Sequence, residues 1–375
     1  MDHLALFIFL ISFGLIFFHF FLYPLILWIF ASIKTAKPDK IVSAHPISFI
    51  ISAYKEEAII RAKLENTLSL SYPKDCLEVI VCSDGDDKTE SIVEEFQTYG
   101  VISLHSNARQ GKAQAINRGL RHASHQIICL SDANCLLESD ALIKMVALFK
   151  DPVIGGVCGR KIVEKSSKRL AANGNYMFWQ LESSIKSLQS RIDSITTGDG
   201  ELFAFRRNAI FNLPSDTVND DTALTLMLTS KKLKVKYAPD AICYEAGSSC
   251  LKEEFHVKSR IAYGHLQILS KYWPLILRSG PVFTLNFISH KVIRHLIPYL
   301  TILSIASAGV MLHQINLTHF AFYGFTFASL IILAVRPIRQ TLISFALANL
   351  AIFYGTLKFI RKSSHLSIWA KAARQ

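Results

Sequence analysis

The stretch LEVIVCSDGDDKTES, residues 77–91, joins an apolar run of β-forming residues to a polar segment with three aspartates around one glycine. Asp and Gly are common turn residues, so taken alone the segment fits a solvated turn as well as a functional site. Two further apolar runs end in polar residues in the same way, namely PISFIISAYKEE (46–57) and QIICLSDAN (126–134). The repetition indicates a sheet whose strands all end in polar clusters.

Segments with helical periodicity separate these runs, including EEAIIRAKLENTLSL (56–70), ESIVEEF (90–96) and AQAINRGLRHA (113–123). Strands that alternate with helices at this spacing predict an α/β fold with a parallel, twisted sheet covered on both faces. In such sheets ligands bind at the carboxyl ends of the strands. The three polar clusters are therefore expected to gather on one edge and to form a site.

The composition indicates membrane segments attached to a globular part, because 51% of the residues are hydrophobic, 19% are charged and the mean hydropathy is +0.30. Residues 4–32 carry no formal charge and exceed the roughly 20 residues that cross a bilayer. The segment starts with Asp2 and His3 and lacks the basic start and small-residue cleavage site of a secretory signal. We therefore expect a retained transmembrane anchor over residues 1–33.

The end of the chain holds three more uncharged stretches, residues 296–312, 320–335 and 342–357. Each is near the lower length limit of a membrane span. This pattern predicts C-terminal membrane helices over residues 291–360 and a basic tail over residues 361–375.

The net charge of +12 could indicate a nucleic-acid partner, but the sequence has no basic helix with interleaved aromatic residues and no zinc-type spacing. Basic residues instead flank the apolar segments, as at Lys34, Lys291 and Arg336. By the positive-inside rule, the domain over residues 34–290 is cytoplasmic and the protein is a multi-pass protein of the plasma membrane. The basic tail opposes this orientation if all four segments span, so one late segment could be interfacial or re-entrant. Seven cysteines without a CxxC pair fit a reducing compartment.

The residues at the predicted strand ends suit a nucleotide diphosphate. Carboxylates can accept hydrogen bonds from a base N–H and ribose hydroxyls, and can hold a hard divalent cation. The segment NARQGKAQAIN (107–117) adds Gly111, which permits close backbone approach, and Lys112, which offers a point charge to phosphate. A Walker loop and a dinucleotide GxGxxG motif are both missing from the sequence.

Eight fragments occur in the order and spacing of membrane-bound family 2 glycosyltransferases, which the chain resembles from about residue 46 to its last apolar segment. They are ISFIISAYKEE (47–57), VIVCSDGDDKT (79–89), RQGKAQAINRGL (109–120), SDAN (131–134), GGVCGRKIV (155–163), TTGDGELFAFRR (196–207), NDDTALTLMLTSKKLKVKYAPDAICYE (219–245) and KSRIAYGHLQIL (258–269). The resemblance implies a GT-A fold, with a nucleotide half over about 46–150 and an acceptor half over about 151–270. It further implies inverting transfer from a nucleotide sugar, such as a UDP-hexose or a UDP-N-acetylhexosamine, to a membrane-associated lipid or saccharide acceptor.

The resemblance assigns a nucleotide-binding role to one set of residues, namely Ala53, Tyr54, Glu56, Asp84, Lys112 and Asp132. Within this set, Asp84 matches the acid that accepts a hydrogen bond from the uracil N–H. Asp86 and Asp87 are expected as turn and helix N-terminal residues, where acids complement the helix dipole.

The fragment SDAN stands where the family carries its DxD motif. Asp132 keeps the first acid, whereas Asn134 replaces the second. An amide oxygen can still coordinate a hard cation, although more weakly than a carboxylate. We therefore expect dependence on Mg²⁺ or Mn²⁺, with Asp132 and Asn134 as ligands.

The acid that performs the chemistry is expected on the acceptor side. In VNDDTAL (218–224), Asp221 matches the general base of the family, although Asp220 and Asp221 precede an apolar helical run and either could cap a helix. TTGDGELFAFRR resembles the acceptor-side loop, in which Gly198 and Gly200 allow close approach and Asp199 is expected to be exposed at the rim.

Processive synthases of this family carry QxxRW after the base, and the corresponding run VKSRI (257–261) keeps only Arg260. Arg260 can still bind the diphosphate. We therefore expect transfer of one sugar or a few, with a processive polysaccharide synthase of the same family as the alternative. Two alternatives come from other classes. One is a membrane-anchored nucleotidyltransferase, which would carry a Gly-rich signature after the first strand, but SAYKEEAII (52–60) contains no glycine. The other is a catalytically inactive membrane scaffold.

Overall fold

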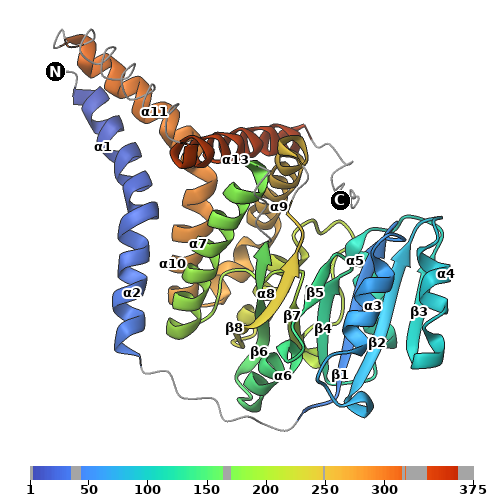
Figure 1. Ribbon diagram of the computed structural model, residues 1–375. Coiled ribbons are helices and arrows are strands. Elements are labelled where there is room, and N and C mark those ends of the chain that lie inside the picture. Colours follow the sequence, from blue (N-terminus) through green and yellow to red (C-terminus); the bar gives the residue numbers. More distant parts are fainter. Residues whose placement is uncertain are drawn as a thin grey trace.

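The computed structural model describes residues 3–34, 44–163, 170–247, 250–314, 317 and 336–361. These residues form one eight-stranded sheet with helices on both faces, beside a group of long helices (Figure 1). The strands are β1 (Ile47–Tyr54), β2 (Leu77–Asp84), β3 (Val101–Ser106), β4 (Ile127–Asp132), β5 (Cys135–Leu137), β6 (Ile154–Val163), β7 (Phe203–Arg206) and β8 (Lys234–Glu245). They are ordered β3-β2-β1-β4-β7-β6-β8-β5 across the sheet. The predicted α/β fold is confirmed.

The helices of the globular part are α3 (Ile60–Leu68), α4 (Thr89–Glu94), α5 (Lys112–His122), α6 (Ala141–Val146), α7 (Leu170–Ile192), α8 (Asp220–Ser230) and α9 (Leu251–Arg278). α3 and α6 contribute to the core on one face of the sheet, and α5, α8 and α9 contribute to the core on the other. Both faces of the sheet are therefore covered, as the apolar strand sequences require.

The four strands β3, β2, β1 and β4 pair in parallel. In this register Tyr54 lies opposite Asp84, and Ser52 lies opposite Asp132. Because the four strands run in the same direction, their carboxyl ends share one edge of the sheet. The polar clusters that follow the apolar runs are therefore brought together there.

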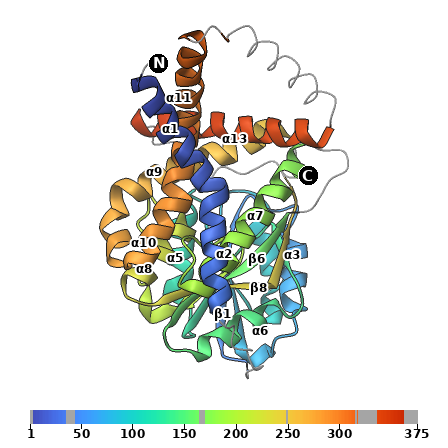
Figure 2. The ribbon, with the colours of Figure 1, turned by 90° about the vertical axis from the view of Figure 1, so that its left-hand side faces the viewer.

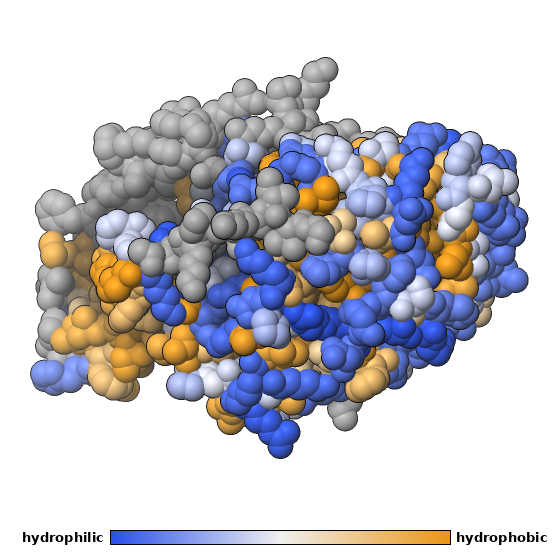
Figure 3. Space-filling view, turned by 90° about the horizontal axis from the view of Figure 1, so that it is seen from below, coloured by the Kyte–Doolittle hydropathy of each residue, from blue (hydrophilic) through white to orange (hydrophobic). Residues whose placement is uncertain are grey.

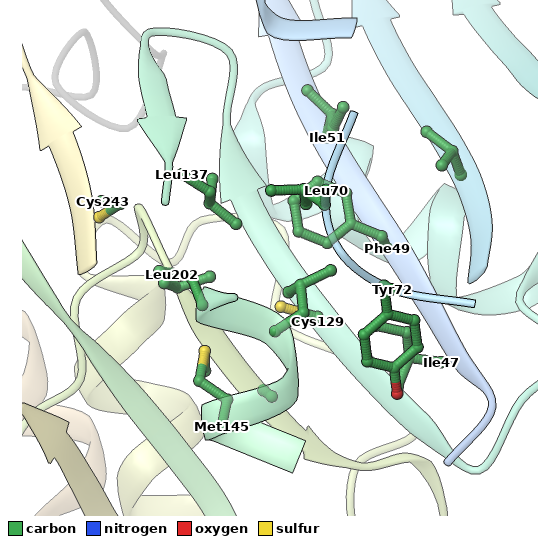
Figure 4. Packing of buried hydrophobic residues seen from close by; sticks show 14 of the residues in the cluster. Ile47, Phe49, Ile51, Leu70, Tyr72, Cys129, Leu137, Met145, Leu202 and Cys243 are labelled. Atoms are coloured by element: carbon green, nitrogen blue, oxygen red, sulfur yellow. The ribbon is translucent and has the colours of Figure 1, made fainter. Parts of the chain in front are cut away.

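The side chains of β1 alternate between two hydrophobic cores, as the period of two along a strand requires. Ile47, Phe49 and Ile51 pack with residues of α3 and α6 (Figure 4). Ile50 points to the other face and packs with residues of α5. Full burial of a side chain such as Phe49, which is 0% exposed, contributes about 1.5–3 kcal/mol to stability.

The other half of the sheet is mixed. β7 runs antiparallel to both β4 and β6, β8 runs parallel to β6, and β5 runs antiparallel to β8. The chain therefore leaves β4 at Asp132 and forms the far edge of the sheet in β5, where Cys135 pairs with Glu245. This crossing places the SDAN turn between the two halves of the sheet.

Three helical segments among the described residues are long and apolar enough to span a membrane: His3–Ile33, Pro281–Gln314 and Arg339–Ile360. They contain α1 (His3–Phe17) with α2 (Tyr23–Ile33), α10 (Pro281–Phe287) with α11 (Ile293–Gln314), and most of α13 (Arg336–Ile360). The predicted apolar stretches at residues 4–32, 296–312 and 342–357 fall within them, which indicates a membrane protein. The stretch at 320–335 and the tail beyond residue 361 lie outside the described residues.

α1 and α11 lie side by side, whereas α13 runs across their direction and rests on α9 (Figures 1 and 2). Seen from below, hydrophobic residues gather on the left, the side of α2 and α10 in Figure 1, and hydrophilic residues dominate elsewhere (Figure 3). Most of the exposed large hydrophobic side chains among the described residues likewise lie in the three candidate membrane segments.

A polar junction joins the first two membrane segments where each contains a π-helical turn, Phe18–Leu22 and Ile288–Val292. The Nδ1 atom of His19 lies 2.9 Å from the carbonyl oxygen of Ser289. A π-helical turn leaves backbone groups without their usual partners, and single turns of this kind recur at functional positions. The contact therefore pairs two irregular turns and holds the anchor against the C-terminal helices.

Glu182 of α7 connects the globular part to the second membrane segment. Its carboxylate accepts bonds from Lys291 Nζ at 2.5 Å and Arg294 Nη1 at 2.7 Å. Burial opposes ionisation of Glu182, but the neighbouring cations outweigh it and hold the pKa well below its usual range. Lys291, which was expected as a charge flanking the second apolar region, is therefore part of a buried ion-pair network with Glu182 and Arg294.

Candidate active site

The first strand end places Tyr54 at the mouth of the predicted donor site. The guanidinium of Arg109 lies 4.3 Å from the centre of the Tyr54 ring, in a cation–π contact. Ala53 is fully buried in the strand behind it. The backbone N–H of Glu56 donates to Thr89 Oγ1 at 2.9 Å, which ties the first strand end to α4.

Asp84 is fully buried and organises the loop before α5. Its Oδ2 accepts from the backbone N–H groups of Gln110 at 2.8 Å and Gly111 at 3.0 Å. Its Oδ1 accepts from Arg118 Nη2 at 2.8 Å. The loop needs glycine at position 111, where φ is +91°. These bonds use both oxygens of the carboxylate and Asp84 is fully buried, so in this arrangement Asp84 holds the loop, and a base N–H reaches it only if the loop moves.

The neighbouring acids have local roles. Asp86 forms an exposed ion pair with Lys55 at 2.6 Å. Asp87 accepts from the Thr89 backbone N–H at 3.3 Å and hydroxyl at 2.8 Å, at the start of α4. These positions match the turn and helix N-terminal roles expected for the two acids.

The ammonium of Lys112 links the two halves of the site. Its Nζ lies 2.9 Å from Asp132 Oδ1 and 3.3 Å from Asp220 Oδ2. Burial disfavours the charged ammonium, but the two carboxylates outweigh burial and raise the pKa of Lys112. Burial raises the pKa of Asp132, and Lys112 opposes that rise. The donor-side lysine therefore pairs with an acid from each side of the site.

Asn134 is oriented by Glu245. Its Nδ2 donates to Glu245 Oε1 at 2.9 Å, while Lys161 Nζ lies 3.2 Å from Glu245 Oε2 and 2.5 Å from Glu201 Oε1. Because a carboxylate only accepts, the amide oxygen of Asn134 is directed away from Glu245.

The cation site expected here consists of one carboxylate and one amide oxygen, which are hard donors of the kind that Mg²⁺ and Mn²⁺ accept. The described part of the chain contains no cluster of three or more His, Cys, Asp and Glu side chains that could hold a metal. One carboxylate and one amide oxygen fit a divalent cation only with further oxygen ligands, which a bound diphosphate can supply.

Asp221 lies in the first turn of α8, beside Asp220. Its Oδ1 accepts from the backbone N–H of Thr222 at 2.6 Å. Burial raises the pKa of Asp221 to about 7, and the charges of Asp220 and Asp199 add to this effect. A carboxylate with a pKa near neutrality is suited to accept a proton, whereas its neighbour Asp220 is paired with Lys112.

The expectation that Asp199 is exposed at the rim is wrong. Asp199 is 6% exposed, and its Oδ1 accepts from Lys186 Nζ at 2.6 Å. The cause is α7, which carries Lys186 into the interior beneath the loop. The loop itself lies close to the site, as a Cβ on Gly200 would be only 2.6 Å from Lys112 Nζ. A Cβ on Gly198 would lie 2.6 Å from the Phe203 ring, so that glycine is required by packing.

Arg260 lies in α9, half-buried, and forms no hydrogen bond or ion pair with another residue that the structure describes. α9 lies close to the segment that precedes Asp221, and glycine at position 264 permits this, because a Cβ there would be 2.2 Å from Asn219 Oδ1. A guanidinium without a partner near the predicted base is available for an anionic ligand.

Several charged residues of the site were not among the predicted ones. Arg118 was detectable, since it belongs to RQGKAQAINRGL and lies about two helical turns beyond the loop that Asp84 holds. Lys161 and Glu245 lie within GGVCGRKIV and the end of the NDDTAL fragment, but the sequence gives no sign that they meet. Lys186 falls in a segment without any motif.

Residues 45–264 match the family model described as "Glycosyltransferase like family 2". The chain belongs to this family. It is therefore an enzyme of the glycosyltransferase class, and the family predicted from the eight fragments is confirmed.

Curated relatives of this glycosyltransferase include two proteins named poly-beta-1,6-N-acetyl-D-glucosamine synthase. The protein from Staphylococcus epidermidis is 28% identical over 61% of this chain and 57% of its own length. The protein from Staphylococcus aureus is 28% identical over 62% of this chain and 58% of its own length. The chain thus matches somewhat more than half the length of these relatives.

Among solved structures, a mannosyltransferase from Pyrobaculum calidifontis in complex with GDP-Man and Mn²⁺ has a similar fold. The TM-score is 0.73 at 22% identity, and the match covers 95% of this chain and 99% of that one. At this identity the match concerns the fold, and it includes the membrane-directed helices as well as the sheet. The GT-A architecture expected from the sequence is confirmed.

Proposed function

We propose that this enzyme transfers a sugar, with inversion, from a nucleotide sugar to a lipid or saccharide acceptor at a membrane. The observation that carries the proposal is the arrangement of two carboxylates, Asp132 beside Lys112 on the donor side and Asp221 with a pKa near 7 on the acceptor side. The first is suited to bind a divalent cation, and the second is suited to accept a proton.

On the donor side, Tyr54 and Asp84 bound the position of the base, and Lys112 approaches the position of the diphosphate. Mg²⁺ or Mn²⁺ would be held by Asp132 and Asn134 and would neutralise the charge of the departing diphosphate. The P. calidifontis mannosyltransferase binds GDP-Man with Mn²⁺, which supports a divalent cation here as well. We expect a UDP-hexose or a UDP-N-acetylhexosamine as donor, in line with the names of the staphylococcal relatives.

On the acceptor side, Asp221 takes the proton of the acceptor hydroxyl as its oxygen attacks C1 of the sugar. The bond between C1 and the diphosphate oxygen breaks, and the nucleoside diphosphate leaves with the electron pair. A pKa of about 7 keeps a large share of Asp221 ionised at neutral pH while its basicity exceeds that of an ordinary carboxyl. Arg260 lies in α9, which packs against α8, and we expect its guanidinium to stabilise developing phosphate charge.

Whether the enzyme adds one sugar or builds a polymer bears on the nature of its acceptor. Arg260 remains from the QxxRW motif, but the Gln and Trp positions are Val257 and Ile261, which offer neither an amide nor an aromatic platform. This favours transfer of one sugar or a few. The processive alternative is favoured by the relatives, which are named as polymer synthases.

The proposed location is the plasma membrane, with the catalytic part on the cytoplasmic side, where nucleotide sugars are expected. Lys34 follows the first span and supports this orientation by the positive-inside rule. Lys291 and Arg294 lie within the candidate span Pro281–Gln314, where they bind Glu182, so they are not counted as flanking charges.

The test is incubation of membranes that contain the protein with a panel of radiolabelled UDP- and GDP-sugars, followed by separation of lipid-soluble from polymeric product. Label in a lipid or short saccharide from one donor supports the proposal, and label in long polymer supports processive synthesis. Release of pyrophosphate instead of a nucleoside diphosphate would indicate a nucleotidyltransferase and contradict both.

A further inference from the structure

The ammonium of Lys112 lies between two carboxylates, Asp132 and Asp220, and its positive charge offsets their negative charge. It is 2.9 Å from Asp132 Oδ1 and 3.3 Å from Asp220 Oδ2, and its side chain is 17% exposed. The two acids come from different elements, the end of β4 and the start of α8. One ammonium thus joins the donor half and the acceptor half of the chain.

The loop at Gly200 closes over this ammonium. A Cβ at position 200 would lie 2.6 Å from Lys112 Nζ and 3.6 Å from Asp220 Oδ2. Glycine therefore leaves just enough room for the ammonium between the loop and the two acids. A side chain at this position would push the end of Lys112 away without removing its charge.

Asp132 cannot serve Lys112 and a divalent cation equally well. Both partners are positive, and two positive charges held by the two oxygens of one carboxylate in a partly buried site still repel strongly. The second position of the motif is the neutral Asn134, which adds no negative charge to hold both cations. Arrival of a divalent cation at Asp132 therefore requires the ammonium to move.

We propose that Lys112 occupies the cation position of the ligand-free enzyme and that its release from Asp132 couples cation binding to donor binding. The proposal rests on the proposed function, since it concerns the same donor site. Once released, the ammonium needs a new anionic partner, and a diphosphate between the two halves of the site supplies one. The cation and the nucleotide then favour each other, and this coupling is reciprocal by linkage.

The size of the effect follows from the strength of the pair. When the binding-competent state is a minor fraction of the protein, the apparent dissociation constant of a ligand is raised by the inverse of that fraction. A charge-assisted bond of ordinary net strength leaves about one-tenth to one-hundredth of the protein with Asp132 released. Removing the ammonium should therefore tighten cation binding about 10-fold to 100-fold.

The experiment measures Mn²⁺ binding to the purified full-length chain in detergent, without nucleotide, by the electron paramagnetic resonance signal of free Mn²⁺. Lys112→Gln should bind Mn²⁺ about 10-fold to 100-fold more tightly than the wild type. Gly200→Ala, which displaces the ammonium but keeps its charge, should also bind more tightly, and it carries the test if Lys112→Gln fails to fold. Lys144→Gln is the matched control, because Lys144 forms a surface pair with Asp140 at 2.8 Å on α6.

Two further measurements make the outcome specific. Asp132→Asn should abolish the tight Mn²⁺ binding in the Lys112→Gln background, which shows that the site is the one at Asp132. UDP or GDP should tighten Mn²⁺ binding more in the wild type than in Lys112→Gln. Equal or weaker Mn²⁺ binding by both Lys112→Gln and Gly200→Ala, relative to Lys144→Gln, would overturn the proposal. None of these readouts needs sugar transfer, so a failed transfer assay would count against the proposed function alone.

Discussion

The pH dependence of sugar transfer should show an acid limb near neutrality, because burial and the charges of Asp220 and Asp199 raise the pKa of Asp221 to about 7. A base must be ionised to accept a proton. With this pKa about nine-tenths of Asp221 is ionised near pH 8 and about one-tenth near pH 6. The value of kcat/KM should therefore fall about ten-fold across that interval, whereas a carboxyl with an ordinary pKa would change by less than about 1%.

The Asp220→Asn variant perturbs the same quantity in a known direction. Removing the Asp220 carboxylate takes away a negative charge that disfavours ionisation of Asp221, so the pKa of Asp221 falls and the acid limb moves to lower pH. The same change also releases Lys112 from its 3.3 Å contact with Asp220. Residual activity near pH 6, relative to each protein's own plateau, should consequently be higher in Asp220→Asn than in the wild type.

The assay is the initial rate of label transfer at subsaturating donor, between about pH 5.5 and pH 9 at constant ionic strength. As a control for unfolding, samples that were incubated at each pH are returned to about pH 8 and their activity there is compared with that of untreated protein. Asp221 is not expected to cause acid unfolding, because a carboxyl whose pKa is raised on folding binds protons more tightly in the native state, so its contribution to stability increases as the pH falls from about 7. A rate that is flat from about pH 6 to pH 8, with the chemical step limiting, would refute the assignment of Asp221 as the base.

Three further predictions concern the donor side and the membrane junction. Asp84→Ala should weaken UDP binding, as measured by calorimetry, and unchanged UDP affinity would remove Asp84 from the base site. The same substitution should lower the free energy of unfolding by about 3–5 kcal/mol in thermal denaturation, because it leaves Arg118 buried without its carboxylate partner at 2.8 Å. Excess chelator should abolish transfer and Mn²⁺ or Mg²⁺ should restore it, whereas full turnover in metal-free samples would refute the cation assignment. Glu182→Gln should lower the free energy of unfolding in detergent by about 3 kcal/mol, since Lys291 and Arg294 lose their shared carboxylate. The control Glu65→Gln, on the exposed face of α3, should leave it unchanged. Equal thermal midpoints of the two variants would contradict the role of Glu182 in joining the globular part to the membrane segment.

The alternation of strands and helices and the sheet edge that carries the site were predictable from sequence because the relevant signals are local. Apolar runs that end in polar residues, with helical periodicity between them, place Tyr54, Asp84 and Asp132 at the carboxyl ends of parallel strands, and the register of β1 with its neighbours confirms this. The roles of Asp86 and Asp87 at a turn and a helix start were equally local.

Contacts between distant segments could not be read in this way. Asp199 was expected at the surface because its segment resembles the acceptor-side loop of the family, but Lys186 of α7 binds it in the interior, and no motif in the sequence marks that helix. The pairing of Asn134 with Glu245 depends on β5 joining the far edge of the sheet, which a three-residue strand does not reveal in advance. Lys112 was expected to face phosphate, and its contact with Asp220 requires knowledge of how the two halves meet.

The central claim is that Asp221 removes the acceptor proton, and the most direct measurement compares sugar transfer by Asp221→Asn with transfer by Asp220→Asn. Both substitutions replace an acid by an amide of nearly the same shape, and Asn caps a helix about as well as Asp does. Asp221→Asn should keep donor binding near the wild-type level and lose about 10²-fold to 10⁴-fold in turnover, the range attributed to positioned proton transfer, whereas Asp220→Asn should retain more activity. Near-normal turnover of Asp221→Asn together with a large loss in Asp220→Asn would contradict this account and move the base by one residue.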